Sequence, residues 1–192
     1  MREFRTKGLI LKSRNLGEND KVVTILTPDL GKIEAKARGA RRITSKLCGH
    51  LEILSVCDFA LYKSTRGLFT ITQGKQLKSF QALKGNLKLI NEAIEIIELI
   101  NLNTAEEQPI EGIFETTSRA LLKMEKAKDK TEKITEEYLR DLLDILGLLP
   151  HREISRKKLK EIIMDHINLP HSFLSTRKTF WTRSSLSKIL SN

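Results

Sequence analysis

Two carboxylates near the start of the chain, Glu18 and Asp20, are close enough in sequence to suggest a metal-dependent hydrolase. A magnesium site, however, usually gathers carboxylates from several elements around a substrate phosphate. The residues that flank this pair, such as Asn19, are typical of a turn. Asp20 is expected either to pair with Lys21 or Arg14 or to accept hydrogen bonds from its own loop. We therefore predict a turn, and a Mg²⁺-dependent hydrolase that uses Glu18 and Asp20 is kept as an alternative.

Other catalytic and metal-binding patterns are absent from the sequence. There is no Gly-rich phosphate loop, no H-E-x-x-H and no G-x-S-x-G motif. The two cysteines, Cys48 and Cys57, form no C-x-x-C pair, and the four histidines complete no zinc-ligand array. We therefore expect free thiols, no catalytic residue, no metal and no cofactor, and hence a protein that is not an enzyme.

The densest basic cluster is the run 38–42, Arg-Gly-Ala-Arg-Arg, with Lys46 four residues further on. Guanidinium groups are suited to phosphate oxygens and to stacking on bases, and the small residues between them leave the backbone open to a phosphate. Lys32 and Lys36 extend the positive charge along the preceding strand, and Arg14 is expected to add to it from the first strand. This arrangement predicts a surface that binds the nucleic-acid backbone.

The 192-residue chain has a net charge of +10, which is unevenly distributed. Residues 1–80 carry 16 basic and 7 acidic side chains, residues 81–150 carry 9 and 14, and residues 151–192 carry 9 and 3. The basic first segment favours a polyanion-binding surface over an evenly solvated lysine surface. Aromatic residues make up only 5% of the chain, so contact by charge with little sequence preference is expected. Since no apolar run is long enough to span a membrane and no secretory signal is present, a cytoplasmic location is expected.

Residues 1–80 show the two-residue hydrophobic period of β-strands, interrupted by turn residues. Strands are predicted at 4–13, 21–27, 32–38, 51–62 and 68–79, with a short helix near 45–48. In the first strand, Leu9 and Leu11 are expected on one face and Ile10 and Lys12 on the other. Five strands of this spacing predict a small closed barrel, an OB-fold in the first place and an SH3-like barrel in the second.

From residue 80 onward the hydrophobic period is helical. One long helix is predicted from the stripe Leu83, Leu87, Ile90, Ile94 and Ile97. Thr104 and Glu107 match a capping box that would start the next helix. Further helices are predicted at 134–149, from 155 towards 167, and at 184–190. We therefore predict an α+β chain with a five-stranded OB-fold β-barrel domain at 1–80 and an α-helical bundle domain at 81–192.

Several runs match a known family in their order and spacing. They are Gly8–Arg14, Gly17–Thr27, Gly31–Ile33 and Ala37–Arg42, with weaker matches at Gly67–Gln73, Ser79–Phe80 and Leu142–Pro150. Together these runs resemble the RecO family of recombination mediators. The resemblance covers residues 1–80 and 140–150, and the helices between them match in kind rather than in motif.

This resemblance implies an OB-fold that binds single- and double-stranded DNA, anneals complementary strands and assists loading of a recombinase on SSB-coated DNA in recombinational repair. It also implies RecR and the acidic C-terminal tail of SSB as partners, and a nucleoid-associated protein of the cytoplasm. The basic positions that match the family are carried over as DNA contacts: Arg14, Lys21, Lys36, Arg38, Arg41 and Arg42. Lys32 and Lys46 complete the predicted set.

One departure from the family pattern follows Pro150. Many members carry a four-cysteine zinc motif soon after the Leu-Gly-x-x-Pro turn, whereas residues 151–158 contain no cysteine here. We therefore expect a short form that lacks the zinc motif. An OB-fold RNA-binding protein in RNA processing or translation is the alternative function.

Overall fold

The computed structural model describes residues 2–43, 45, 47, 51–65, 67–127, 131–149 and 155–166. The predicted DNA contact Lys46 and the predicted terminal helix at 184–190 lie outside the described residues, and the predicted helix at 45–48 lies partly outside them. The chain divides into two compact units. The first unit comprises residues 1–80 and 104–118, and the second comprises residues 81–103 and 119 onward. The prediction that residues 1–80 and 81–192 form two separate domains therefore stays a proposal.

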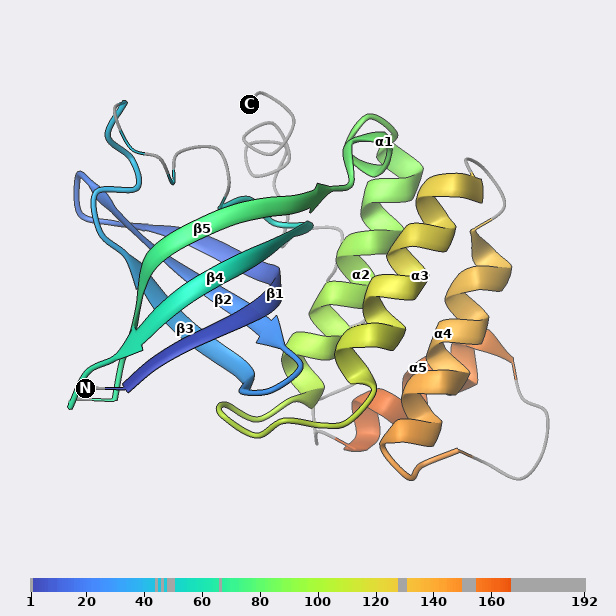
Figure 1. Ribbon diagram of the computed structural model, residues 1–192. Helices are drawn as coiled ribbons and strands as arrows, with labels where there is room; N and C mark the ends of the chain where they lie inside the picture. The colour runs from blue at the N-terminus through green and yellow to red at the C-terminus, as the bar shows by residue number, and fades with distance from the viewer. Residues whose placement is uncertain are drawn as a thin grey trace. The chain divides into compact units, whose positions relative to one another are not determined.

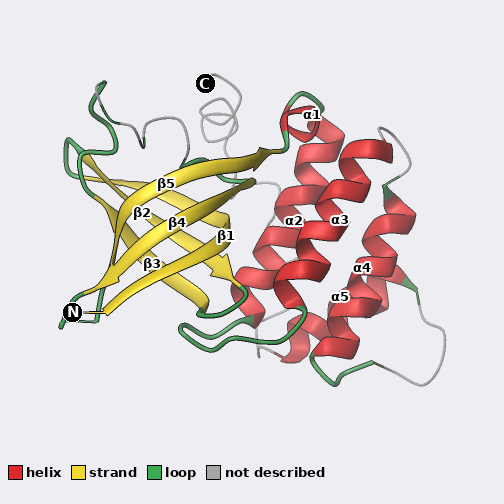
Figure 2. Cartoon of the chain, in the orientation of Figure 1, coloured by secondary structure: helices red, strands yellow, loops and turns green. Residues whose placement is uncertain are grey.

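The first unit is a closed five-stranded barrel (Figure 1). Its strands are β1 (Arg2–Leu16), β2 (Asp20–Thr27), β3 (Gly31–Ala37), β4 (Ser55–Lys63) and β5 (Phe69–Ser79). They follow the order β1-β2-β3-β5-β4, with β4 pairing back to β1, and only β3 and β5 run parallel. This arrangement confirms the predicted OB-fold, and Figure 2 distinguishes by colour the strands and the helices of the predicted α+β chain.

The barrel interior is filled by the alternate residues of each strand. In β3, Ile33, Ala35 and Ala37 are buried in the core, as the alternation predicts. Cys57 on β4 is also buried there, as a free thiol, and burial raises the pKa of this thiol to about 12. The interior of the unit is therefore apolar, and charged side chains of β3 are left on its outer face.

A β-bulge changes the predicted faces of β1. The pairing of β1 with β2 shifts between Ile10 and Lys12, so Ile10 lies opposite Ile25 while Lys12 lies opposite Thr24. Because Ile25 is in the barrel core and Thr24 is not, Ile10 and Lys12 face opposite sides of the sheet. The prediction that they share a face is therefore wrong. The bulge directs Lys12, and two residues later Arg14, to the outside.

The capping box predicted at Thr104 and Glu107 is wrong. The segment 104–109, which we call the strap, is not helical, and the next helix begins only at Ile113. The backbone of Glu107 has φ 56°, and its N–H donates to the carbonyl of Lys32 at 2.8 Å. Its carboxylate pairs with Lys63, whose ammonium group also lies 5.0 Å from the ring centre of Phe69. The strap is therefore bonded to strands of the barrel, and it does not begin a helix.

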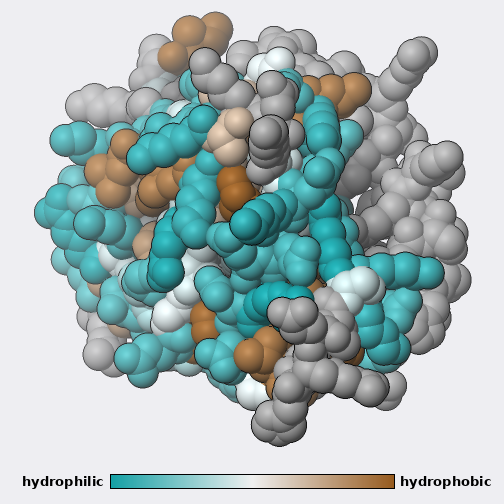
Figure 3. Space-filling view, turned by 90° about the vertical axis from the view of Figure 1, so that its right-hand side faces the viewer, coloured by the Kyte–Doolittle hydropathy of each residue, from teal (hydrophilic) through white to brown (hydrophobic). Residues whose placement is uncertain are grey.

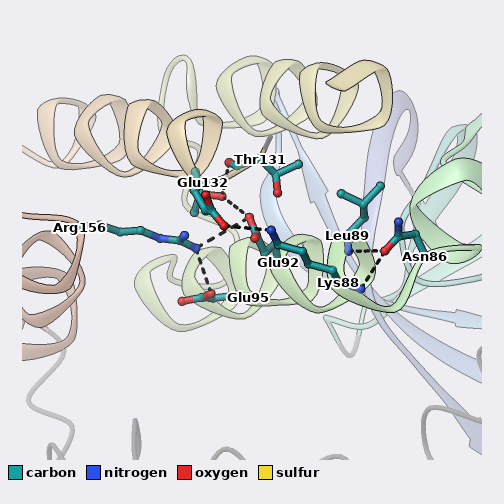
Figure 4. Close-up of polar contacts among 9 residues, drawn as sticks. Asn86, Lys88, Leu89, Glu92, Glu95, Thr131, Glu132 and Arg156 are labelled. Carbon is teal, nitrogen blue, oxygen red and sulfur yellow. Dashed lines mark hydrogen bonds and ion pairs between the residues drawn. The ribbon is translucent and has the colours of Figure 1, made fainter. Parts of the chain in front are cut away.

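The second unit begins with two helices, where the sequence pattern predicted one long helix. Its first helices are α1 (Gln81–Lys84) and α2 (Leu87–Asn103). Between them, the side-chain oxygen of Asn86 accepts hydrogen bonds from the backbone N–H of Lys88 at 3.0 Å and of Leu89 at 3.3 Å (Figure 4). These are the bonds of an N-cap, which begins a new helix. Leu87 is 61% exposed and does not belong to the buried stripe, whereas Ile90, Ile94 and Ile97 do.

The remaining described helices are α3 (Ile113–Ala127), α4 (Glu132–Ile145) and α5 (Arg156–His166). Among the described residues no helix is long and apolar enough to cross a membrane. Charge pairs connect α5 to α2. Arg156 lies 3.9 Å from Glu92 and 3.7 Å from Glu95 (Figure 4). Lys160 also contacts Glu95. The face of the molecule in Figure 3 is mainly hydrophilic where residues are described, with separate hydrophobic areas.

Candidate nucleic-acid interface

The loop that follows β3 carries the predicted arginines, and it is tied to the turn between β1 and β2. The backbone N–H of Arg41 donates to the carbonyl of Asn19 at 3.0 Å. The guanidinium of the same residue donates to the carbonyl of Gly17 at 2.9 Å. We call residues 38–42 the basic loop. Both bonds go to backbone carbonyls, and no carboxylate in the described part of the chain forms an ion pair with Arg41.

Asp20 is the main anchor of the basic loop. One of its carboxylate oxygens accepts a hydrogen bond from the backbone N–H of Gly39 at 2.8 Å, and the other lies 2.8 Å from the ammonium of Lys36. These hydrogen bonds from Lys36 and Gly39, together with the nearby positive charge of Arg38, hold the pKa of Asp20 below its usual range. The prediction that Asp20 pairs with Lys21 or Arg14 is wrong, because the sheet register brings Lys36 to it instead.

The occupied carboxylate of Asp20 argues against the hydrolase alternative. Both of its oxygens are engaged by the protein, and the Glu18 side chain is exposed. Within the described ranges, no group of three or more His, Cys, Asp or Glu side chains is placed to hold a metal ion. In this structure Asp20 therefore fixes the backbone of the basic loop at Gly39.

The three arginines of the basic loop, Arg38, Arg41 and Arg42, are all exposed. A tight turn brings them together: the N–H of Arg42 donates to the carbonyl of Gly39 at 3.0 Å. Gly39 has φ 63°, a left-handed conformation that glycine adopts without steric cost. Among the described residues, no carboxylate lies within ion-pair distance of these guanidinium groups. They can therefore donate hydrogen bonds to phosphate oxygens without first breaking an ion pair.

Two further predicted contacts lie on the outer face of the sheet next to the basic loop. Arg14 of β1 is opposite Val22 of β2, which in turn is opposite Lys36 of β3. The two cations therefore lie on the same face of the sheet, with β2 between them. Arg14 is 3.6 Å from Glu34, and its side chain is 59% exposed. Such an exposed pair contributes little and exchanges readily for a phosphate. Lys21 lies opposite Ala37, which is in the barrel core, so the register puts Lys21 on the inner face of the sheet and not on the face of Arg14 and Lys36.

Lys32 does not join this cluster. It lies six residues before Arg38, which is about 20 Å along an extended strand. Its backbone bridges to Glu106 of the strap, and its side chain is only partly exposed. Burial lowers the pKa of Lys32, while the charge of Glu106 acts in the opposite direction. The structure thus places Arg14 and Lys36 on the face beside the basic loop with Arg38, Arg41 and Arg42. Lys21 is on the opposite face of β2, and Lys32 is at the other end of β3.

Sequence reasoning missed two features of this surface. The role of Asp20 as an anchor depends on the pairing of β2 with β3, which residue spacing does not reveal. Ile43, directly after Arg42, is 100% exposed and was not predicted as a surface residue. An exposed aliphatic side chain beside a basic loop is suited to contact bases or sugars rather than phosphates. The only sequence signal for it is its position next to the arginines.

Comparisons with known proteins agree with the geometry of the first unit. The model of the family described as recombination protein O N terminal matches residues 1–80. The DNA repair protein RecO of Alkaliphilus metalliredigens is 34% identical over 148 residues, which are 77% of this chain and 60% of that protein. The RecO of Bacillus subtilis is 31% identical over 146 residues, 76% of this chain and 56% of that protein. The RecO of Salinibacter ruber is 29% identical over 162 residues, which are 84% of this chain and 62% of that protein. The matched part of the chain thus corresponds to about 60% of these relatives.

Proposed function

Because residues 1–80 belong to the family of RecO N-terminal domains, we propose that this chain is a non-enzymatic mediator of recombinational DNA repair. In this role it binds single- and double-stranded DNA, anneals complementary strands and assists loading of a recombinase on SSB-coated DNA. The observation that supports this proposal most directly is the basic loop, where Arg38, Arg41 and Arg42 are exposed without carboxylate partners among the described residues. A nucleoid-associated location in the cytoplasm follows from the same proposal.

Annealing by such a surface needs no covalent chemistry. Two complementary strands repel each other as polyanions, and a protein that neutralises phosphates on both lowers this barrier. The basic loop offers three guanidinium groups, and Arg14 and Lys36 add charge on the adjoining face of the sheet. Each neutralised phosphate releases bound counterion, so affinity for single strands falls with salt at a log–log slope of about −0.7 per contact.

RecR and the C-terminal tail of SSB are the proposed partners, on the strength of the family resemblance. A tail that is both acidic and apolar requires a surface with cations beside hydrophobic side chains. We place this contact in the α-helical domain proposed for residues 81–192. Annealing of complementary oligonucleotides coated with intact or tail-deleted SSB tests the proposal. We expect annealing only when the tail is present, and equal annealing on both forms of SSB would contradict the tail contact.

The first prediction concerns the basic loop itself. We expect the triple variant Arg38→Ala, Arg41→Ala, Arg42→Ala to bind DNA of every sequence more weakly, because three phosphate contacts are lost. The salt slope for single strands should become flatter by about 2. Fluorescence anisotropy of labelled oligonucleotides over a series of KCl concentrations measures both quantities.

The matched control removes the same charge elsewhere. Lys123, Lys126 and Lys133 are exposed residues of the helical part, and their replacement by alanine also lowers the net charge by three. This control is expected to retain the salt slope of the wild type. If both triple variants lose affinity equally, net charge and not the basic loop determines binding. Competition between DNA and RNA strands of matched sequence separates the DNA mediator from an RNA-binding protein, since preferential RNA binding would favour the latter.

A further inference from the structure

We propose that Asp20 is a positioning residue for DNA binding: a carboxylate inside a basic interface that increases affinity because it fixes the basic loop. This inference rests on the proposed function and adds to it a residue whose charge is opposite to that expected of a DNA contact. Asp20 itself touches no phosphate in this role. It acts through Gly39 and Lys36, to which its two carboxylate oxygens are joined.

The argument begins with the backbone of the basic loop. Gly39 is the second residue of the loop, and its N–H is held by Asp20 at 2.8 Å. The carbonyl of the same residue accepts the N–H of Arg42 at 3.0 Å, which closes the turn that brings Arg38 and Arg42 together. On the far side of the turn, Arg41 is bonded to Asn19 and Gly17. The turn that carries Asp20 therefore holds the basic loop at both Gly39 and Arg41.

Two effects of Asp20 on DNA binding have opposite signs. Its negative charge repels phosphate and occupies the ammonium of Lys36, which weakens binding. Its hydrogen bond to Gly39 orders the basic loop before DNA arrives, which spares the cost of ordering it on binding. A hydrogen bond with a charged acceptor is among the strong ones, whereas a partly exposed charge is screened by water and salt. We therefore expect the ordering effect to exceed the repulsion.

Two substitutions at this position separate the effects. Asp20→Asn removes the charge and frees Lys36 but keeps an oxygen that accepts the N–H of Gly39, whereas Asp20→Ala removes both. Glu18→Gln and Glu18→Ala are the matched controls, because Glu18 is an exposed carboxylate in the same turn. If only charge mattered, all four variants would bind DNA more tightly than the wild type.

We expect Asp20→Ala to bind a fluorescent oligothymidylate about five- to tenfold more weakly than the wild type, the net scale of one ordinary hydrogen bond. Asp20→Asn should bind with equal or up to about fivefold higher affinity. Both Glu18 variants should bind with equal or slightly higher affinity. Binding by Asp20→Ala that equals or exceeds that of Asp20→Asn would overturn the positioning role.

Hydrogen exchange gives a readout that does not depend on DNA. The amide of Gly39 should exchange about tenfold faster in Asp20→Ala than in the wild type, because its acceptor is gone. In Asp20→Asn and the Glu18 variants it should stay close to the wild-type rate. An unchanged rate in Asp20→Ala would disprove the anchoring by itself. If exchange behaves as expected but the wild type does not bind the oligothymidylate, the proposed function fails while the anchoring of the loop is retained.

Discussion

Arginine and lysine have different roles at this surface. The ammonium of Lys36 is engaged by Asp20, while the guanidinium of Arg41 uses one donor on the carbonyl of Gly17. A guanidinium has five N–H donors, so Arg41 can hold the turn and still present donors to a phosphate. A lysine with its single ammonium group at the end of a flexible stem does not combine these two tasks as well. The arginines of the basic loop are therefore expected to dominate affinity, and the lysines around it to tune the local charge.

Asp58 gives a prediction on pH dependence. Its carboxylate lies 3.0 Å from the guanidinium of Arg5 on the neighbouring strand, and this hydrogen bond lowers the pKa of Asp58. A carboxyl whose pKa is lower in the folded than in the unfolded state stabilises the fold above its unfolded value of about 4, and this contribution is lost as the pH falls through the folded value. We expect Asp58→Asn to lower the free energy of unfolding at neutral pH and to have little effect well below pH 4.

Denaturant unfolding across a pH series measures this difference. The partner provides the control: in the Asp58→Asn background, replacing Arg5 by Gln should not alter the pH dependence further. A wild type and an Asp58→Asn variant whose stabilities differ by the same amount at neutral and at acid pH would contradict the assigned pair.

At the scale of single residues, the sequence predicted kinds of side chain better than their partners. The cluster of Arg38, Arg41 and Arg42 was predicted because it is local in the sequence. The pairs of Asp20 with Lys36 and of Arg14 with Glu34 were not predicted. They depend on which residues the register of β1, β2 and β3 places side by side. A carboxylate pattern by itself does not contain this information.

The hairpin between β2 and β3 requires a glycine at position 31, because of its backbone conformation and the close approach of the strap. Its φ is 68°, and a Cβ at this position would lie 2.4 Å from the backbone of Gln108 in the strap. A side chain here meets both backbone strain and a clash with main-chain atoms that cannot rotate away. We expect Gly31→Ala to lower the free energy of unfolding by about 2–4 kcal/mol, as measured by denaturant unfolding.

Gly67 is the matched control for this prediction. It has φ 88°, but among the residues that the structure describes nothing lies within 4 Å of the Cβ that alanine would add. Gly67→Ala is expected to cost only the backbone strain, about 1 kcal/mol. Equal destabilisation by the two substitutions would show that the close approach of the strap does not contribute.

Helix α5 is connected to α2 by a group of charges of low exposure. Glu95, with a side chain 16% exposed, contacts Arg156 of α5 (Figure 4). It also contacts Lys160 of the same helix. Glu95→Gln leaves these two cations without this carboxylate, so we expect a loss of about 1.5–3 kcal/mol and faster hydrogen exchange in α5. Glu137→Gln, which removes an exposed pair with Lys123, should cost less than about 1 kcal/mol. Equal losses would mean that α5 is held by its apolar side chains alone.

The hydrophobic period predicted the elements well wherever it was regular. It located β2, β3 and β5 to within a residue or two at each end, and it found the buried stripe of α2. It gave wrong predictions where an N-cap, a β-bulge or a long-range backbone hydrogen bond determines the local structure. Asn86 caps a new helix inside the predicted long one, and the bulge near Leu11 reverses the faces of β1. Glu107 resembles a capping residue, but its backbone bond to Lys32 forms the strap instead.

For the whole molecule, net charge is a poor guide to the binding surface. The chain has a net charge of +10, and the first 80 residues carry most of it, yet several of their cations are paired. What distinguishes the basic loop is that its three arginines are exposed and that, in the described part of the chain, no carboxylate pairs with them. The guanidinium of Arg41 donates to a backbone carbonyl, which leaves its charge available to a phosphate.

The last prediction concerns the stability of residues 1–80 as a domain on their own. The first compact unit includes residues 104–118, which follow α2 of the second unit in the sequence. A fragment of residues 1–80 lacks the strap and its contacts with Lys32 and Lys63. We therefore expect the fragment to unfold at a lower denaturant concentration than the barrel does in the whole chain.

The thiol of Cys57, buried in the barrel core, is a local reporter of this unfolding when Cys48 is replaced by serine. Adding a peptide of residues 104–118 should protect Cys57 of the fragment from alkylation in a concentration-dependent way, because binding to the folded state stabilises it by mass action. The same peptide with Glu107→Lys should protect less, since its charge opposes that of Lys63. A fragment that is as stable as the barrel in the whole chain, and indifferent to both peptides, would establish residues 1–80 as a complete domain and the strap as dispensable.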